Sequence, residues 1–214
     1  MVTSFADGTK ISFEQAVVAN ATGFSVAKRG MLGPELDGPI EEAHKVFDLD
    51  LLRSSGGLVD YVLGATPGPG VFVLAEMPDD SQKIYLDYLK MGDGPLYCFY
   101  QPYHLCHLEL PNSIIRAVEY GDATIAPTHG LQVDVITTAK QDLEAGKVLD
   151  GLGGFDTYGQ CENRPVAASQ DLLPIAAAKD CILKNPIKKD EPIKYADVEM
   201  PEGRFADGLR AQCV

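Results

Sequence analysis

One stretch decides the predicted fold of the second half of this chain, namely Lys140-Gln-Asp-Leu-Glu-Ala-Gly-Lys-Val-Leu149. A second stretch repeats its pattern 44 residues later, in Lys184-Asn-Pro-Ile-Lys-Lys-Asp-Glu-Pro-Ile193. In both, an apolar residue follows a basic residue by three positions, and a turn residue and another apolar residue come next. Two such copies predict a pseudo-symmetric pair of β-loops that close on one another. The alternative is chance, because strands flanked by turns often look alike.

The sequence changes character around Pro127-Thr-His-Gly130. From Leu131 onward, short apolar runs alternate with Gly and Pro, which predicts a compact, mostly β module without a long helix. Before that point, expected strands and helices alternate irregularly, which favours a sheet with helices on one side. We therefore predict an α+β fold with two domains, at residues 1–127 and at residues 128–214 with a C-terminal tail.

Turn residues and apolar spacing predict the elements of the first half. Ser12 and Gln15 fit a capping box at the start of a helix, and Gly23 fits its end. The other expected elements are a short helix at 41–47, strands at 58–63, 71–76 and 96–100, and a helix at 111–120 with an apolar face.

Composition argues against several kinds of partner. The net charge of −13 disfavours electrostatic binding to nucleic acid or to an anionic membrane. No apolar run approaches the ~20 residues of a membrane-spanning helix, and residues 1–10 lack the basic-then-apolar order of a secretory signal. Five scattered cysteines without a Cys-x-x-Cys pair favour a reducing, cytoplasmic location.

Lys10 and Glu14 are candidate catalytic residues. Lys10 is expected just before, or in the first turn of, a helix whose free N–H groups favour an anion. Its ammonium can bind a substrate phosphate or carboxylate, or give a proton to the alkoxide formed when hydride reaches a carbonyl. Glu14, four residues later, can orient that ammonium. The alternative is an ordinary solvated ion pair.

Four further residues are candidates for substrate binding. Asn20 and Thr22, near the end of the same helix, can hydrogen-bond a polyol or a nicotinamide amide, although capping before Gly23 is the alternative. Lys28 and Arg29 form a basic corner on a flexible loop that can clamp a phosphate or carboxylate. The alternative for this pair is a surface turn.

His104, Cys106 and His107, with Cys98 upstream, form the densest set of potential metal ligands. Their spacing does not match that of structural zinc sites, so we predict that no metal binds. We expect His104 to act in catalysis and His107 to contact the substrate. Cys161 lies beside a carboxylate, so its pKa should be raised and it should not act as a nucleophile.

Six stretches in order carry a family likeness: Asp7-Gly-Thr-Lys-Ile-Ser-Phe-Glu14, Ala19-Asn-Ala-Thr-Gly23, Arg29-Gly-Met-Leu-Gly-Pro-Glu35, Pro67-Gly-Pro-Gly-Val-Phe-Val73, Pro102-Tyr-His-Leu-Cys-His107 and Thr157-Tyr-Gly-Gln-Cys-Glu162. They resemble the catalytic region of homoserine-dehydrogenase-like oxidoreductases, a family that includes an alternative type of 1-deoxyxylulose-5-phosphate reductoisomerase. Residues 139–149 and 187–198 look like the SAF domain, a small β-clip module named for sialic acid synthase, antifreeze protein and a flagellar assembly protein.

The resemblance implies the C-terminal portion of an NAD(P)-dependent oxidoreductase that acts on a small hydroxy or oxo substrate, phosphorylated sugar-like compounds included. It also favours the catalytic interpretation of Lys10 and Glu14. Family members carry an N-terminal Rossmann domain, and no strand followed by Gly-x-Gly-x-x-Gly occurs in this sequence. We therefore expect NAD or NADP to be bound mainly by a domain that is not present here, and this chain to be inactive alone.

Two other functions stay open. The first is a non-catalytic module that binds carbohydrates or sugar acids, in which the SAF domain is the working part. The second is an assembly role through the β-clip, with a homo-oligomer as its product.

Overall fold

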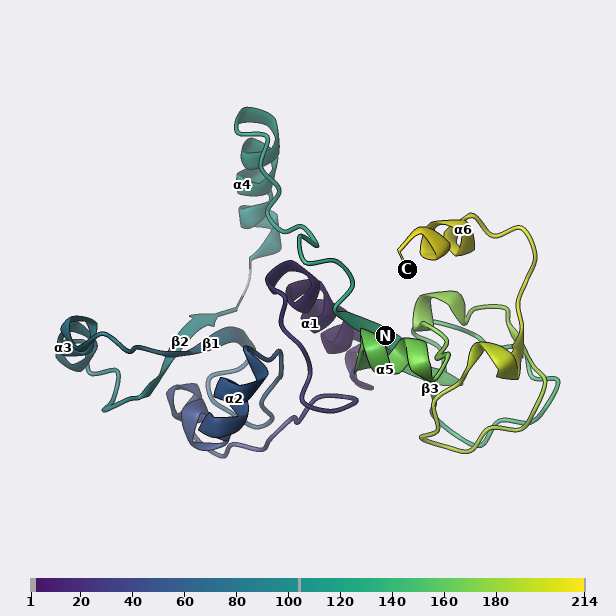
Figure 1. The fold of residues 1–214 in the computed structure, drawn as a ribbon, viewed down its shortest axis with the longest axis horizontal. Helices are drawn as coiled ribbons and strands as arrows, with labels where there is room; N and C mark the ends of the chain where they lie inside the picture. Colours follow the sequence, from purple (N-terminus) through teal and green to yellow (C-terminus); the bar gives the residue numbers. More distant parts are fainter. Residues whose placement is uncertain (1–2, 104, 214) are drawn as a thin grey trace. The chain divides into compact units, whose positions relative to one another are not determined.

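The structure is a computed structural model that describes residues 3–103 and 105–213 (Figure 1). It contains helices and small antiparallel sheets, which confirms the predicted α+β class. The chain divides into a first unit, Met1–Leu32, Gly57–Asp60 and Ile125–Val214, and a second unit, Gly33–Gly56 and Tyr61–Thr124. The division into domains at residues 127 and 128 stays a prediction. None of the described helices is long and apolar enough to cross a membrane.

The first unit is built on the antiparallel pair of β3 (Val133–Ala139) and β4 (Thr157–Asn163). All seven β3 residues are buried. The other elements of this unit are η1 (Thr3–Phe5), α1 (Thr9–Thr22), α5 (Arg164–Ser169), η3 (Ile175–Ala177), β5 (Ile182–Leu183), η4 (Tyr195–Asp197), β6 (Val198–Glu199) and α6 (Phe205–Gln212). β5 and β6 pair antiparallel.

Helix α1 packs closely on β3 and β4 because its buried face carries small side chains. The buried residues are Thr9, Ser12, Ala16 and Ala19, which recur at helical spacing. Opposite them, β4 has Gly159, where a Cβ atom would lie 2.7 Å from Val135 Cγ1. The same Cβ would lie 3.1 Å from Thr9 Cγ2 on α1, so a side chain at this position would force neighbouring residues of the helix or of β3 to shift.

The start of α1 differs from the prediction. The helix begins at Thr9, so the capping box expected from Ser12 and Gln15 is wrong. Ser12 instead lies in the second turn, where its Oγ donates to Gly8 O at 2.8 Å and to Gly159 O at 3.2 Å. The predicted end at Gly23 is confirmed, with φ 82° at the glycine.

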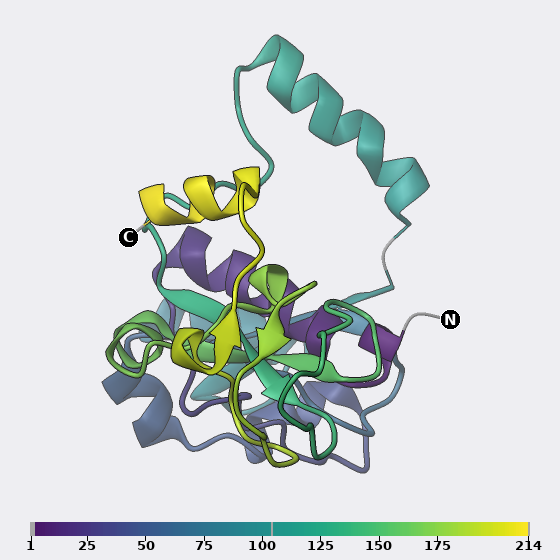
Figure 2. The same ribbon diagram turned by 90° about the vertical axis from the view of Figure 1, so that its right-hand side faces the viewer.

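The pseudo-symmetric pair of β-loops is confirmed. Leu143 and Ile187, which are equivalent in the repeat, exchange backbone hydrogen bonds of 2.8 and 2.9 Å. Further along, Leu149 N–H donates to Cys181 O at 2.9 Å, and the equivalent Ile193 N–H donates to Thr137 O at 2.9 Å. Each hydrogen bond therefore has a counterpart 44 residues away, in which the donor comes from the other copy of the repeat. Figure 2 shows the two loops side by side.

The turns of the two loops obey the same symmetry. Gly146 N–H donates to Leu183 O at 2.7 Å, and the equivalent Asp190 N–H donates to Ala139 O at 2.9 Å. Both turn residues have left-handed backbones, with φ 83° at Gly146 and 66° at Asp190. Gly and Asp tolerate this conformation better than most residues, which explains why different residues occupy equivalent positions.

The second unit contains the antiparallel pair of β1 (Gly70–Glu76) and β2 (Leu96–Pro102). Its other elements are η2 (Ile40–Lys45), α2 (Leu49–Ser55), α3 (Asp80–Tyr88) and α4 (Cys106–Glu119). One face of the sheet packs on a core of Leu36, Ile40 and Ala43 through Phe72, Leu74 and Tyr100. The predicted strands at 71–76 and 96–100 are thus confirmed, and the short helix at 41–47 occurs as η2.

The structure of this half differs from the expected elements in three places. The strand expected at 58–63 is replaced by isolated bridges, Ser25 with Leu58 and Glu35 with Leu63. Helix α3 was not predicted, although Ile84, Tyr85 and Tyr88 recur at helical spacing within it. Helix α4 begins five residues before Pro111, which lies inside it.

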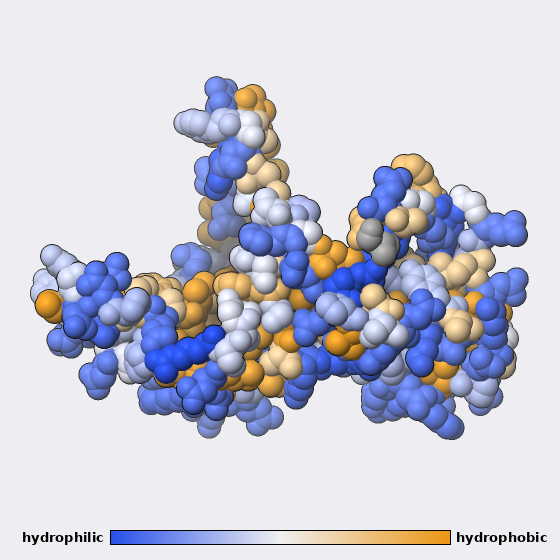
Figure 3. All heavy atoms as spheres, viewed as in Figure 1, coloured by the Kyte–Doolittle hydropathy of each residue, from blue (hydrophilic) through white to orange (hydrophobic). Residues whose placement is uncertain are grey.

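Helix α4 is amphipathic, yet none of its residues is buried. Leu108, Ile115 and Val118 on its apolar side are 62, 49 and 73 % exposed. Figure 3 shows apolar side chains open at the surface of this helix.

Candidate functional site

Lys10 and Glu14 lie together on the first two turns of α1. Lys10 Nζ is 3.2 Å from Glu14 Oε1, and the two side chains are 42 and 53 % exposed. The same ammonium lies 4.9 Å from the centre of the Phe5 ring. An exposed helical ion pair contributes only about 0.3–0.5 kcal/mol. Because the ion pair is weak and both side chains are exposed, either of them can contact a ligand from solvent.

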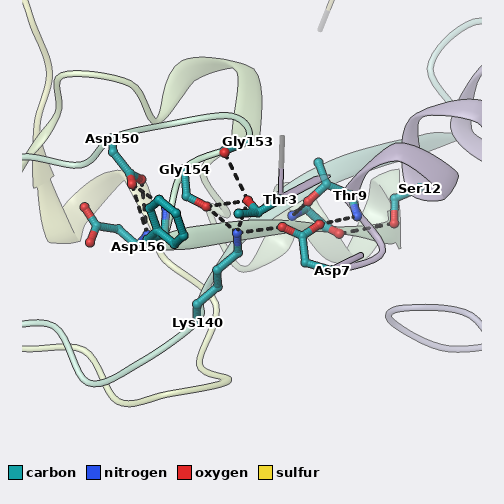
Figure 4. A network of polar contacts seen from close by, with 11 residues as sticks. Thr3, Asp7, Thr9, Ser12, Lys140, Asp150, Gly153, Gly154 and Asp156 are labelled. Carbon is teal, nitrogen blue, oxygen red and sulfur yellow. Dashed lines mark hydrogen bonds and ion pairs between the residues drawn. The ribbon is translucent and has the colours of Figure 1, made fainter. Parts of the chain in front are cut away.

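A polar network holds the segment that leads into α1 (Figure 4). Lys140, which directly follows β3, places its Nζ 2.6 Å from Asp7 Oδ2 and 2.9 Å from Thr3 Oγ1. It also donates to Gly154 O. Thr3 Oγ1 in turn donates to Gly154 O at 2.6 Å. The network joins the segment before α1 to the β-loop region.

Asp7 connects this network to the helix itself. Its Oδ1 accepts the Thr9 N–H at 2.8 Å, while its Oδ2 has no described partner other than Lys140. Burial raises the pKa of the Asp7 carboxyl, but hydrogen bonds from Lys140 and Thr9 outweigh it and leave that pKa below its usual value. The carboxylate is thus held ionised at the positive end of the helix.

Asn20 and Thr22 are engaged with the backbone. Asn20 Oδ1 accepts the N–H groups of Gln132 and Val133 at 2.7 and 2.9 Å, and its Nδ2 donates to Val133 O. Thr22 Oγ1 donates to Val18 O at 2.8 Å. These bonds fix the end of α1, and a role for either residue in substrate binding stays a prediction.

The basic corner is attached to β4 through Arg29. Its Nε lies 2.7 Å from Glu162 Oε2, and its Nη2 donates to Gln170 Oε1 at 2.6 Å. Glu162 is 5 % exposed, so this guanidinium neutralises a buried carboxylate. Lys28 is exposed and forms no ion pair in the described part of the chain. Of the two basic residues, Lys28 therefore leaves its charge open to an anion.

The predicted roles of His104 and His107 are not tested by the structure. His104 lies outside the described residues, so its expected catalytic role stays a prediction. His107 is exposed in the first turn of α4, in the second unit. Among the described residues, no group of three or more His, Cys, Asp or Glu side chains could hold a metal ion.

Cys161 has the raised pKa that its sequence predicts, but for a different reason. Its Sγ is buried and donates to Ser12 O at 3.1 Å. Burial raises the pKa of the thiol to about 12. The adjacent Glu162 carboxylate, engaged by Arg29, is not the cause.

Sequence reasoning did not identify Asp7, Lys140 and Thr3 as parts of the site. Asp7 begins the first stretch of the family likeness, and Lys140 begins the first copy of the internal repeat, but neither pattern assigns the residue a role in the site. The internal repeat gives no signal for Lys140, because its equivalent Lys184 is exposed and forms no ion pair with a described residue. The repeated pattern of loops does not require a buried ammonium at this position.

Comparison with known proteins identifies a family. The family model described as oxidoreductase DRL, catalytic domain, matches residues 1–110. The matched range includes all the candidate residues from Lys10 to His107, and it ends before Lys140 and the β-loops. No curated protein matches the chain.

Proposed function

This chain belongs to the oxidoreductase DRL catalytic-domain family, and on that premise we propose that it is the substrate-handling portion of an NAD(P)-dependent oxidoreductase. The proposed substrate is a small hydroxy or oxo compound, with phosphorylated, sugar-like compounds as the first class to test. The proposed relatives are the homoserine-dehydrogenase-like and reductoisomerase-like enzymes. The observation that carries the proposal is the open ammonium of Lys10 within the family-matched range.

The position of Lys10 suits proton transfer to an oxygen. Lys10 lies in the first turn of α1, close to the positive end of the helix dipole, where Asp7 already accepts the Thr9 N–H. A carbonyl oxygen bound there would accept a proton from Lys10 as it became an alkoxide. Glu14, 3.2 Å from the ammonium, would orient it. Proton transfer of this kind contributes about 10²–10⁴-fold to a rate.

The described residues do not fit the pyrophosphate of a dinucleotide. Such a site requires a glycine-rich turn between a strand and the N-terminus of a helix. Residues 67–70 instead lead into strand β1, and residues 151–154 precede strand β4. We therefore place NAD or NADP mainly on a domain outside this chain.

Nicotinamide binding tests this proposal. The chain would be joined to the sequence encoded directly upstream of Met1 and titrated with NADPH and NADH, followed by fluorescence. We expect binding by the joined protein and none by the 214-residue chain alone. Absence of nicotinamide binding by a folded joined protein would refute the proposal.

Turnover by the joined protein tests the role of Lys10. We expect Lys10→Ala to lower kcat by about 10²–10⁴-fold without weakening nicotinamide binding. The matched control is Lys45→Ala, because Lys45 also forms an exposed helical ion pair, 2.8 Å from Glu42. Equal kcat values for the two variants would count against Lys10.

The paired β-loops support a second candidate, a SAF-type module that binds carbohydrates or sugar acids. A thermal-shift screen of sugar acids and sugar phosphates separates the two. A ligand at about 100 times its Kd stabilises the folded state by about 2.7 kcal/mol. Stabilisation that survives Lys10→Ala and His104→Ala favours the binding module, and its loss favours the oxidoreductase.

A further inference from the structure

Lys140 is a well-enclosed lysine. Its side chain is only 17 % exposed, and its ammonium faces three oxygens, on Asp7, Thr3 and Gly154. Figure 4 shows Nζ directed into the gap between these groups. Because burying an ammonium is costly unless it is paired and hydrogen-bonded, this arrangement specifies the position of all three partners.

One path from Lys140 leads to the backbone of Lys10. Asp7 Oδ2 binds the Lys140 ammonium, and Asp7 Oδ1 accepts the N–H of Thr9. Thr9 is the residue before Lys10, and its Oγ1 accepts the Gly159 N–H at 2.8 Å. The first turn of α1 is therefore attached to β4 and, through Asp7, to the residue that directly follows β3.

A second path leads to the side chain of Lys10. Thr3 Oγ1 accepts from Lys140 and donates to Gly154 O, which fixes the short helix η1. Phe5 is the last residue of η1, and its ring lies 4.9 Å from the Lys10 ammonium. A cation over an aromatic face is attracted by the ring quadrupole, so the position of Phe5 influences that of Lys10.

We propose that Lys140 is a positioning residue for Lys10, acting through Asp7 on its backbone and through Phe5 on its side chain. The consequence for catalysis rests on the proposed function of Lys10. In this arrangement Lys140, which lies outside the family-matched range of residues 1–110, sets the position of Lys10, which lies within it. The β-loop pair then supports the catalytic group in addition to folding on itself.

The Lys10 side chain reports its own position by NMR. In protein labelled with [ε-13C]lysine, the ring current of Phe5 should displace the Lys10 Cε–Hε cross-peak from the position of solvent-exposed lysines. Lys10→Arg identifies the peak by its loss, and Phe5→Leu should abolish the displacement. This measurement needs neither substrate nor cofactor.

We expect Lys140→Met to remove most of the displacement, and Lys140→Arg to retain part of it because a guanidinium can still donate to Asp7. Lys147→Met is the matched control, because the Lys147 ammonium pairs with Asp156 at 3.1 Å instead of with the segment that leads into α1. Thr3→Val breaks the side-chain path alone and should also reduce the displacement. A folded Lys140→Met protein with an unchanged Lys10 peak would overturn the proposal.

Activity of the joined protein distinguishes this proposal from the proposed function. Where nicotinamide-dependent turnover exists, Lys140→Met should lower kcat more than it raises KM, because a misplaced proton donor affects the reaction more than binding. If no turnover exists but the Lys10 peak responds, the proposed function fails and the positioning role stands. If turnover exists and neither kcat nor the peak responds, the positioning role fails.

Discussion

The Lys140–Asp7 pair can be measured by a double-mutant cycle. Lys140→Met replaces the ammonium with an apolar group of similar length and leaves the Asp7 carboxylate, whose side chain is 15 % exposed, without its counter-charge. Removing one partner of a buried ion pair costs about 3–5 kcal/mol. Because both side chains retain some contact with water, we expect a loss near the lower limit, about 3 kcal/mol.

The same substitution should cost less in a protein that already carries Asp7→Asn. The Lys140 ammonium has no counter-charge in that protein, so Lys140→Met removes only its hydrogen bonds to Thr3 and Gly154 and leaves no buried charge behind. This loss costs about 1 kcal/mol. The two costs therefore differ by a coupling free energy of about 2 kcal/mol, within the range for residues in direct contact. Urea unfolding of the four proteins at neutral pH, followed by far-ultraviolet circular dichroism, measures both.

Lys188→Met serves as the control for this cycle. Its ammonium lies 2.8 Å from Asp142, and the two side chains are 73 and 56 % exposed, so its removal should leave the free energy of unfolding almost unchanged. An equal cost of Lys140→Met with and without the Asp7→Asn substitution would show that the pair carries no charge coupling, and the reasoning would be refuted.

Three further predictions concern stability and surface. Folding lowers the pKa of the Asp7 carboxyl. The ionised carboxylate therefore stabilises the folded protein fully above the unfolded pKa of about 3.9, and this stabilisation is lost as the pH falls through the lower pKa of the folded state. Asp7→Asn should accordingly reduce the dependence of the free energy of unfolding on pH in the acid range. Gly159→Ala should destabilise by about 1–3 kcal/mol in thermal melts, because its Cβ would lie 2.7 Å from Val135 Cγ1, whereas Gly208→Ala, with no neighbour within 4 Å, should not. Val118→Asp should reduce the fluorescence of bound anilinonaphthalene sulfonate, since Val118 is 73 % exposed on α4; an unchanged signal would mean that this face does not bind the dye.

Local patterns in the sequence were sufficient to predict the β-loops and two strands. The loops were predictable because each turn residue and each inward apolar residue repeats after 44 positions, and the hydrogen bonds follow the same offset. The strands at 71–76 and 96–100 were predictable from their apolar and aromatic residues, bounded by Gly and Pro. In each case the residues that decide the structure are close together in the sequence.

The start of α1 shows how one local pattern can conceal another. Ser12 and Gln15 fit a capping box, but the Asp7 carboxylate accepts the Thr9 N–H and the helix begins at Thr9, four residues before the start that a cap at Ser12 implies. Helix α3 begins with a similar signal, since the Asp79 side chain accepts the Ser81 N–H, but no helix was predicted there.

The polar network could not have been predicted from local patterns. Thr3 and Lys140, which form one of its hydrogen bonds, are 137 positions apart. Nothing in the repeat distinguishes Lys140 from Lys184, and only the fold brings the first of them to Asp7. Residue types near Lys10 could therefore be identified from the sequence, but the groups that hold Lys10 could not.

Helix α1 lies within the family-matched range, but the strands that support it lie outside that range. The helix carries Lys10 and Glu14, but its buried face packs on β3 and β4, which lie beyond residue 110. Each end of the helix has its own attachment there: Thr9 accepts the Gly159 N–H, and Asn20 binds the backbone of Val133. A 14-residue helix is only marginally stable alone in water, so these strands are needed to maintain it. The C-terminal segment is thus part of the structure that presents the candidate catalytic residues, and substitutions in β3 or β4 should affect them even though no residue of these strands belongs to the matched range.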